Sequence, residues 1–230
     1  MVISPKFFTI SWICYIIYTY LQKSLLMETL ELFLSSWIAS RFERGRIFFV
    51  EDLEPSGLEP EVLRVLLSRL IRKNLVVIRL ARGVYCYPRV ASESMKMIVP
   101  GPEEVAAALA ARWRVRIAPC GAQAAYLSGL TSVCLYPYTY VSDGSPQVFR
   151  LQGGKTVEFI RRRSVKVFDF RSVKLRNLVE GLRHIGQENL TEDDLRVVDR
   201  TVREVPGEDF LHDVRLAPLW IRQVLLSSRG

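Results

Sequence analysis

The sequence feature that most restricts the fold of this 230-residue chain is a succession of helix and strand patterns over residues 27–88. From Thr29 to Glu43, apolar side chains recur every three to four residues, which is typical of one face of a helix. They are Leu30, Phe33, Leu34, Trp37, Ile38 and Phe42. Gly45 is expected to end this helix, and Arg46–Val50 predicts a short strand.

A second long helix is expected to begin at Pro60, a residue suited to the first helical turn, after a short helix over Glu51–Glu54. Its predicted buried stripe consists of Val62 or Leu63, Leu66, Leu67, Leu70 and Ile71. Its outer stripe consists of Arg64, Ser68 and Arg72, with Arg69 and Lys73 alongside. Leu75–Leu80 and Val84–Tyr87 then predict two strands joined by a turn over residues 81–83.

Helix, short strand, short helix, long helix and hairpin follow one another in the order of a winged helix-turn-helix. In such a domain the second long helix lies in the major groove of DNA, and the hairpin, or wing, reaches the phosphate backbone. The candidate DNA-binding residues are Arg64, Ser68, Arg69, Arg72 and Lys73 in the helix and Arg79 and Arg82 in the wing. Winged helices also dock proteins, and Glu59 and Glu61 favour that alternative because they repel phosphate.

Residues 1–26 differ from the rest of the chain. The sixteen residues between Lys6 and Lys23 carry no charge, whereas a bilayer helix needs about 20 apolar residues. The segment lacks the small-residue cleavage site of a signal peptide. Three interpretations are open: an extension of a chain that starts at Met27, a membrane anchor, or an extra packed helix. We favour the first, because an amphipathic helix opens directly after Met27.

The charge of the chain is unevenly distributed around a net value of +8. Its 49% hydrophobic and 24% charged residues exclude a disordered chain, a collagen and a coiled coil. Residues 150–180 carry nine basic and three acidic side chains, whereas residues 187–213 carry nine acidic and three basic ones. The basic segment predicts a polyanionic partner, with a solvated surface as the alternative. A possible second basic surface consists of Arg161, Arg162, Arg163 and Lys166.

Beyond residue 90 the pattern predicts a mixed domain. Helices are expected at Glu103–Trp113, Ala122–Ser128, Ser172–His184, Thr191–Val205 and Ala217–Leu226. Strands are expected at Val115–Ala118, Val133–Val141, Gln147–Leu151, Thr156–Ile160 and Val165–Phe168. Ser142–Gly144 is a predicted hairpin turn, and Gly153–Gly154 is expected to join the next two strands.

Candidate catalytic residues are few. The four cysteines form no C-x-x-C pair, and two histidines are too few for most histidine-based metal sites. Cys120 follows Pro119 at the start of a predicted helix, a position that lowers the pKa of a thiol, and His184 and His212 are the candidate bases. A small residue at a helix cap explains Cys120 better. We therefore expect no enzyme, no cofactor and no metal.

Several strings carry a family resemblance. They are RLARGVYCYP in the predicted wing, PGPEEVAAALAARWRVRIAPCGAQAAYLSGLT after it, and the C-terminal LRHIGQENLTEDDL and LAPLWIRQVL. Together they resemble the abortive-infection antitoxin family, in the branch long classed as a conserved domain of unknown function. The resemblance covers about Met27 to Leu226. It implies a winged helix that represses its own operon, and a C-terminal domain that counters a toxin with a nucleotidyltransferase fold.

The resemblance carries over to specific positions. They are Arg79, Arg82, Gly83 and Tyr85 in the wing, and Pro119, Gly121, Ala124, Gly129, Leu130 and Thr131 in the following domain. Cys120 stands where the family pattern has a serine, and Glu59 and Glu61 acidify the proposed recognition helix. Residues 1–26 have no counterpart in the pattern.

These observations predict an α+β protein in two domains. After the extension of residues 1–26, we expect an N-terminal winged helix-turn-helix over residues 27–90, then a mixed α/β domain with a C-terminal helical segment over residues 91–230. We expect a cytoplasmic, DNA-binding regulator whose partners are the double-stranded DNA of its own promoter and a nucleotidyltransferase-like toxin. The alternatives are a protein-docking module without DNA binding and a membrane-anchored regulator.

Overall fold

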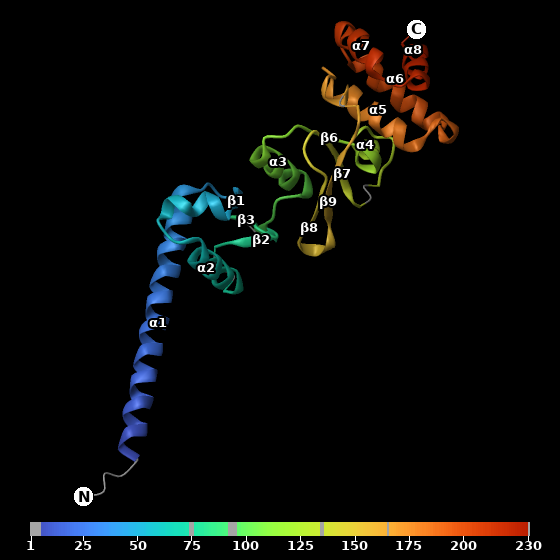
Figure 1. Cartoon of the computed structure of the whole chain (residues 1–230). Helices are drawn as coiled ribbons and strands as arrows, with labels where there is room; N and C mark the ends of the chain where they lie inside the picture. The colour runs from blue at the N-terminus through green and yellow to red at the C-terminus, as the bar shows by residue number, and fades with distance from the viewer. Residues whose placement is uncertain (1–5, 74–75, 92–95, 134–135, 165, 230) are drawn as a thin grey trace, which may run out of the picture. The chain divides into compact units, whose positions relative to one another are not determined.

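The computed structural model describes residues 6–73, 76–91, 96–133, 136–164 and 166–229. The fold is mixed α+β, and the chain forms two compact units, Met1–Pro100 (unit 1) and Gly101–Gly230 (unit 2). Each unit has its own sheet and its own buried core (Figure 1). Parts of three predicted strands, at Leu75, at residues 134–135 and at Val165, lie outside the described residues.

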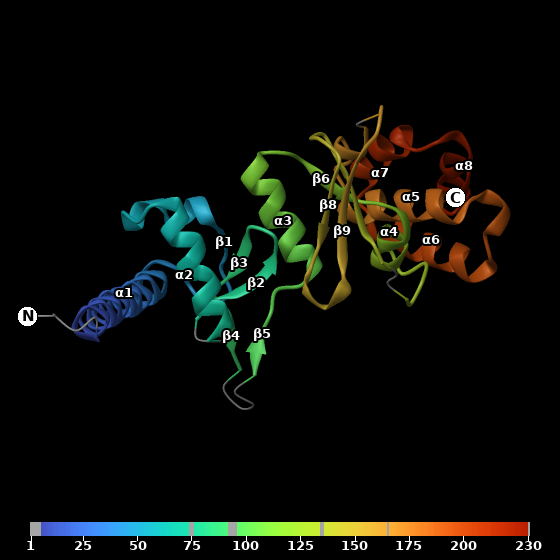
Figure 2. The same ribbon diagram turned by 60° about the horizontal axis from the view of Figure 1, so that its bottom comes forward.

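Unit 1 is built around a small antiparallel sheet. Its elements are α1 (Lys6–Arg41), β1 (Ile47–Phe49), the 3-10 helix η1 (Val50–Ser56), α2 (Pro60–Arg72), β2 (Ile78–Ala81), β3 (Val84–Cys86), β4 (Arg89–Val90) and β5 (Met97–Ile98). The strand order is β1-β3-β2, with both pairings antiparallel. β4 and β5 pair separately, also antiparallel. Figures 1 and 2 both show α2 beside the β2–β3 hairpin.

The first helix is longer than the sequence pattern predicts. It is expected from Thr29 but begins at Lys6 and runs without interruption to Arg41. The physical reason is that no proline or glycine lies between these two residues, so nothing stops the backbone hydrogen bonding of the helix. Within the described part of the chain, no helix combines the length and apolar character needed to cross a bilayer.

The core of unit 1 confirms most of the predicted apolar stripes. Leu34 and Ile38 of α1 are fully buried, and Trp37 and Phe42 are partly buried against the same cluster. Phe33 is the exception, with 46% of its surface exposed. At 100° per residue Phe33 lies at the edge of the stripe, where α2 and the sheet do not cover it.

Unit 2 contains a four-stranded sheet between helices. From its start to the last strand of the sheet, unit 2 consists of α3 (Pro102–Trp113), β6 (Ile117–Pro119), α4 (Gly121–Leu127), β7 (Tyr138–Ser142), β8 (Gln147–Arg150), the 3-10 helix η2 (Gln152–Gly154) and β9 (Thr156–Arg161). The strand order is β6-β7-β9-β8. Figures 1 and 2 both show α3 on one side of this sheet and α4 on the other. On the α3 side, Trp113 contacts the rings of Phe149 and Phe159.

Two strand predictions in unit 2 are wrong. The turn at Ser142–Gly144 does not join neighbouring strands, because β7 pairs in parallel with β9 and antiparallel with β6. β8 lies at the sheet edge and pairs only with β9, as predicted for the strands around Gly153–Gly154. Lys166–Phe168, expected as part of a strand, forms the 3-10 helix η3, in which Val167 is buried against β6 and β7 residues. An apolar run of this length does not distinguish a strand from a buried turn.

The C-terminal helices form a second core in unit 2. They are α5 (Val173–Ile185), the 3-10 helix η4 (Gln187–Asn189), α6 (Glu192–Glu204), α7 (Gly207–Asp213), the 3-10 helix η5 (Val214–Leu216) and α8 (Leu219–Ser227). Thr191 caps α6 as predicted, because its hydroxyl accepts the N–H of Asp194 and the Asp194 carboxylate accepts the N–H of Thr191. The fully buried carboxylate of Asp213 accepts the N–H groups of Arg171 and Ser172 and so holds the start of α5 against α7.

A glycine allows α4 and α5 to pack closely. A Cβ added to Gly181 of α5 would lie 2.9 Å from the Cα of Ala125 in α4 and 2.9 Å from Leu130. Leu130 follows Gly129, whose positive φ of 80° reverses the chain after α4. The N–H of Leu130 then bonds to the carbonyl of Ala125 over 2.9 Å. The string SGLT of the family resemblance therefore has a packing role.

We predict that a chain starting at Met27 unfolds at the temperature of the full chain, within about 4 °C. Residues 22–26 are exposed, and the contacts described between α1 and the core begin with the partly buried Met27. Thermal unfolding followed by circular dichroism measures this, and amide exchange at Leu34 and Ile38 reports the core directly. A lower midpoint with faster exchange at these two amides would show that the N-terminal segment supports the core.

Candidate nucleic-acid interface

Helix α2 presents two opposite faces. Leu63, Leu66, Leu67 and Leu70 are fully buried, which confirms the predicted apolar stripe. On the other side, Arg64, Ser68 and Arg72 are exposed at i, i+4 and i+8, together with Val65. Pro60 occupies the first turn, as predicted. The exposed stripe is therefore fixed in direction by the burial of the leucines opposite to it.

Two of the predicted DNA-binding residues are engaged within unit 1. Arg69 and Lys73 both form ion pairs with the carboxylate of Glu31 on α1, Lys73 over 2.5 Å. The Glu31 side chain is 5% exposed, whereas those of Arg69 and Lys73 are 31% and 45% exposed. These contacts join α1 to α2 and compensate part of the positive charge of α2.

The protonation of Glu31 depends on the same two residues. Burial by itself raises the pKa of the Glu31 carboxyl, but the hydrogen bonds from Lys73 and Arg69 and their charges outweigh it, so the pKa lies below its ordinary value. The ionised form of Glu31 therefore stabilises the fold. Sequence analysis missed Glu31, although its position within the apolar stripe, three residues before Leu34, is a signal for a buried carboxylate.

The β2–β3 hairpin carries the two arginines predicted for the wing. Arg79 and Arg82 are both exposed, and the Nε of Arg79 donates to the carbonyl of Ala81 over 3.3 Å. The register between the strands shifts between Arg79 and Ala81, and Gly83 adopts a positive φ of 76° in the turn. Tyr85, opposite Arg79, is buried and stacks on Phe48. The hairpin is thus anchored by Tyr85 and offers its arginines to solvent.

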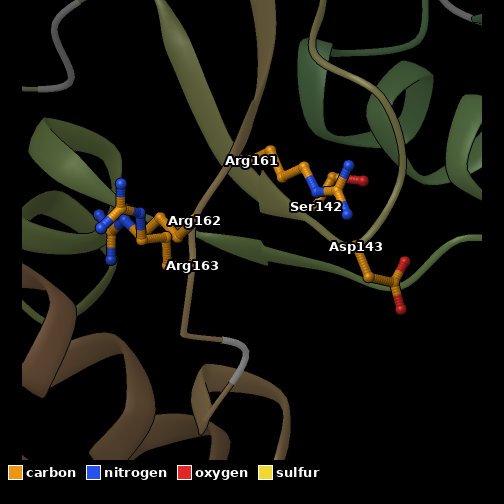
Figure 3. Close-up of a pocket in the computed structure, with 5 residues that line it drawn as sticks. All are labelled: Ser142, Asp143, Arg161, Arg162 and Arg163. Atoms are coloured by element: carbon orange, nitrogen blue, oxygen red, sulfur yellow. The ribbon is translucent and has the colours of Figure 1, made fainter.

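The second basic surface lies where the two central strands of the unit 2 sheet, β7 and β9, end. Arg161 ends β9, and Arg162 and Arg163 follow it along a pocket that Ser142 and Asp143 also line (Figure 3). Arg162 pairs with the nearly buried Glu180 of α5 over 2.5 Å. Lys166 is exposed but does not line this pocket. The four predicted residues therefore do not form one continuous set.

The Cys120 thiol lies in surroundings that disfavour its ionised form. Cys120 is buried, and burial raises its pKa to about 11, with Arg162 lowering it and Glu180 raising it to smaller extents. The expectation that its position at the start of α4 lowers the pKa is thus wrong, because the loss of solvent dominates. A Cβ on Gly121 would lie 4.0 Å from the Nδ1 of His184, so this histidine does come near the turn.

His212, the other candidate base, lies against a carboxylate in the C-terminal helices. Its Nδ1 is 2.9 Å from the Oδ1 of the buried Asp213. In the part of the chain that the structure describes, no group of three histidine, cysteine or acidic residues converges to hold a metal ion.

Comparisons with known proteins place the chain in a family. Residues 36–209 match DUF6088, a family of unknown function, and the chain belongs to it. A crystal structure of the RV2827C protein from Mycobacterium tuberculosis is similar at a TM-score of 0.46 and 16% sequence identity, over 85% of this chain and 75% of that one. A likeness at this level carries no argument about function. No curated protein matches the chain. The abortive-infection role implied by the sequence resemblance stays a prediction.

We predict that Glu31→Gln lowers the free energy of unfolding at pH 7 by about 1–3 kcal/mol, because it leaves Arg69 and Lys73 without their carboxylate. Since the folded pKa of Glu31 is depressed, its contribution is complete above the unfolded pKa of about 4.3 and disappears as the pH falls through the folded pKa. Urea unfolding at pH 7 and at pH 3 measures both effects. Glu28→Gln, at an exposed position one turn earlier, is the matched control. Equal stability of the two variants at pH 7 would contradict the prediction.

We also predict that Cys120 resists alkylation in the folded chain. With a pKa of about 11, its thiolate fraction at pH 8 is on the order of 100-fold below that of an ordinary cysteine, and burial slows the reagent further. Iodoacetamide labelling at pH 8, followed by mass mapping of the peptide containing Cys120, measures the rate. The same peptide should label readily in denaturant. Comparable rates in both conditions would show that the thiol is accessible.

Proposed function

We propose that this member of DUF6088 is a DNA-binding regulator in which unit 1 is a winged helix-turn-helix. The order α1, β1, η1, α2, β2, β3 and the sheet order β1-β3-β2 support this interpretation. In it, α2 is the recognition helix and the β2–β3 hairpin is the wing. The proposed target is the double-stranded DNA upstream of its own gene.

The observation that carries the proposal is the exposed stripe of α2. Arg64, Ser68 and Arg72 project from the side opposite the buried leucines, and a helix with such a stripe fits the major groove. Val65, which is 51% exposed, lies beside Arg64 and offers an apolar contact to a thymine methyl group. Arg79 and Arg82 of the wing provide contacts to phosphates.

The residues of α2 divide into two roles under this proposal. Arg64 and Arg72 contact DNA, whereas Arg69 and Lys73 hold α2 against α1 through Glu31. Among the described residues, Arg64 pairs with Glu61 alone, at 3.5 Å and with both side chains largely exposed. Such an exposed pair is worth about 0–1 kcal/mol, so it breaks readily when Arg64 meets a phosphate or a base.

A protein-docking role is the second candidate, and one observation favours it. Glu59 and Glu61 are exposed at the N-terminal end of α2, where recognition helices usually read bases. Acidic side chains at that position oppose phosphate and suit a basic protein partner.

We further propose that the chain counters a toxin with a nucleotidyltransferase fold. This part is supported by the motif resemblance, which includes Pro119, Ala124 and Thr131 of unit 2. The test is whether a neighbouring reading frame encodes such a protein and whether co-expression with this chain restores growth. If the neighbouring frame encodes such a toxin and co-expression of this chain leaves its toxicity unchanged, the proposed antitoxin role is rejected.

We predict that the chain binds the DNA upstream of its own gene, with log K falling by about 0.9 per phosphate contact for each decade of salt. Arg64→Ala should weaken binding by about 1–3 kcal/mol if Arg64 contacts a guanine, and should relax sequence preference. Arg82→Ala should weaken binding to all duplexes alike. Fluorescence anisotropy with the upstream fragment and a scrambled duplex, from low to physiological salt, measures these effects.

The control for this experiment is Arg203→Ala. Arg203 is an exposed arginine in the acid-rich segment of unit 2, so its loss removes one positive charge without touching α2 or the wing. It should bind DNA like the unaltered chain. Binding that is unchanged in a triple Arg64/Arg72/Arg82 alanine variant, or absent at low salt, would leave the protein-docking role as the better interpretation.

A further inference from the structure

A pocket opens where two parallel strands end side by side. Ser142 is the last residue of β7 and lies in register with Arg161, the last residue of β9. The pocket measures about 440 Å³, and small-molecule sites typically span about 300–1,000 Å³. Open α/β sheets commonly bind ligands beyond the carboxyl ends of their parallel strands, and this pocket has that position.

Two of the charged groups along the pocket are already neutralised. The carboxylate of Asp143 accepts two hydrogen bonds from Arg116, one from the backbone N–H over 2.8 Å and one from the side-chain Nε–H over 2.9 Å. These bonds keep the pKa of Asp143 below its ordinary value. Arg162 pairs with Glu180, whose side chain is 4% exposed and also pairs with Arg183 over 3.4 Å. Asp143 and Arg162 are therefore both engaged by partners within unit 2.

Two cations remain uncompensated. Arg161 and Arg163 are exposed, and among the described residues neither side chain has an ion-pair partner. The pocket thus holds two available positive charges and no available negative one. A guanidinium group presents paired N–H donors that match the oxygens of a phosphate.

Ser142 adds a buried hydroxyl to this cationic wall. The residue is 2% exposed, and its Oγ accepts the N–H of Gly144 over 3.0 Å, which leaves the hydroxyl hydrogen free to be donated. Figure 3 shows the Arg161 side chain extending toward Ser142, whereas Arg162 and Arg163 leave the strand in the other direction. A hydroxyl donor and a guanidinium thus converge on one place.

We propose that this pocket binds a phosphate monoester. The Ser142 hydroxyl and the Arg161 guanidinium donate to its oxygens, whereas Arg163, on the other side of the strand, adds only to the positive potential of the pocket. A phosphate monoester has two sources, a free nucleotide and the 5′ end of a nucleic acid. The site is independent of the DNA-binding role proposed for unit 1.

The test measures binding of inorganic phosphate, adenosine 5′-monophosphate and adenosine to the full chain by calorimetry at constant ionic strength. Phosphate and the nucleotide should bind, and adenosine should not. Arg161→Gln should weaken nucleotide binding by about 10- to 100-fold, because a charge-assisted contact is lost. Ser142→Ala should also weaken nucleotide binding, although Arg161 is unchanged in this variant. Since Ser142 is buried, thermal unfolding of each variant checks that it folds.

Arg150→Gln is the matched control. Arg150 is exposed on β8 of the same sheet and pairs with Thr156 at the start of β9, so it lies at the end opposite Arg161. This variant should bind the nucleotide as tightly as the unaltered chain. Equal losses in Arg161→Gln and Arg150→Gln would show a diffuse charge effect and overturn the proposal, as would the absence of binding by both phosphate and the nucleotide.

Two single-stranded oligonucleotides of one sequence, with and without a 5′-phosphate, distinguish the sources. Tighter binding of the phosphorylated strand, lost in Arg161→Gln, identifies a nucleic-acid end as the ligand. Binding of the mononucleotide with no preference between the strands identifies a free nucleotide. Equal binding of both strands with no binding of phosphate or the nucleotide would mean that the surface contacts phosphodiesters, and the monoester site would be rejected.

Discussion

The burial of four leucines on α2 is the constraint on which the rest of unit 1 depends. Leu63, Leu66, Leu67 and Leu70 are all fully buried, and each such burial stabilises the fold by about 1.5–3 kcal/mol. These contacts fix the rotation of α2 about its own axis, and a helix rotated to bury its other face would lose them. The direction of the exposed stripe around Ser68 is therefore a consequence of core packing.

Buried carboxylates determine which positive charges are available to a ligand. Glu31 engages Arg69 and Lys73 in unit 1, and Glu180 engages Arg162 in unit 2. Because a carboxylate removed from water needs partners, each one selects nearby cations and withdraws their charge from the surface. The net charge counted along the sequence therefore overestimates the positive charge that a surface offers to a ligand. The cations that have no carboxylate partner indicate a binding surface better than the total charge does.

The strings that carry the family resemblance serve packing at several positions. Ala124 is fully buried, Gly129 reverses the chain with a positive φ, and Leu130 lies against Gly181 of α5. Tyr85 of the string RLARGVYCYP is buried against Phe48. The residue types in these strings therefore follow from packing as much as from any activity, since close packing restricts residue type as strongly as chemistry does.

The sequence by itself determined the features that depend on neighbours a few residues apart. The buried leucines of α2, the capping of α6 by Thr191 and the exposed stripe at Arg64 all follow from helical periodicity and local hydrogen bonding. Only the tertiary structure decided the parallel pairing of β7 with β9, which creates the pocket at Ser142, and the Glu31 contacts, which span 38 and 42 residues. The entropy of closing a loop changes slowly with its length, so chain length hardly favours one strand partner over another, and packing makes the choice.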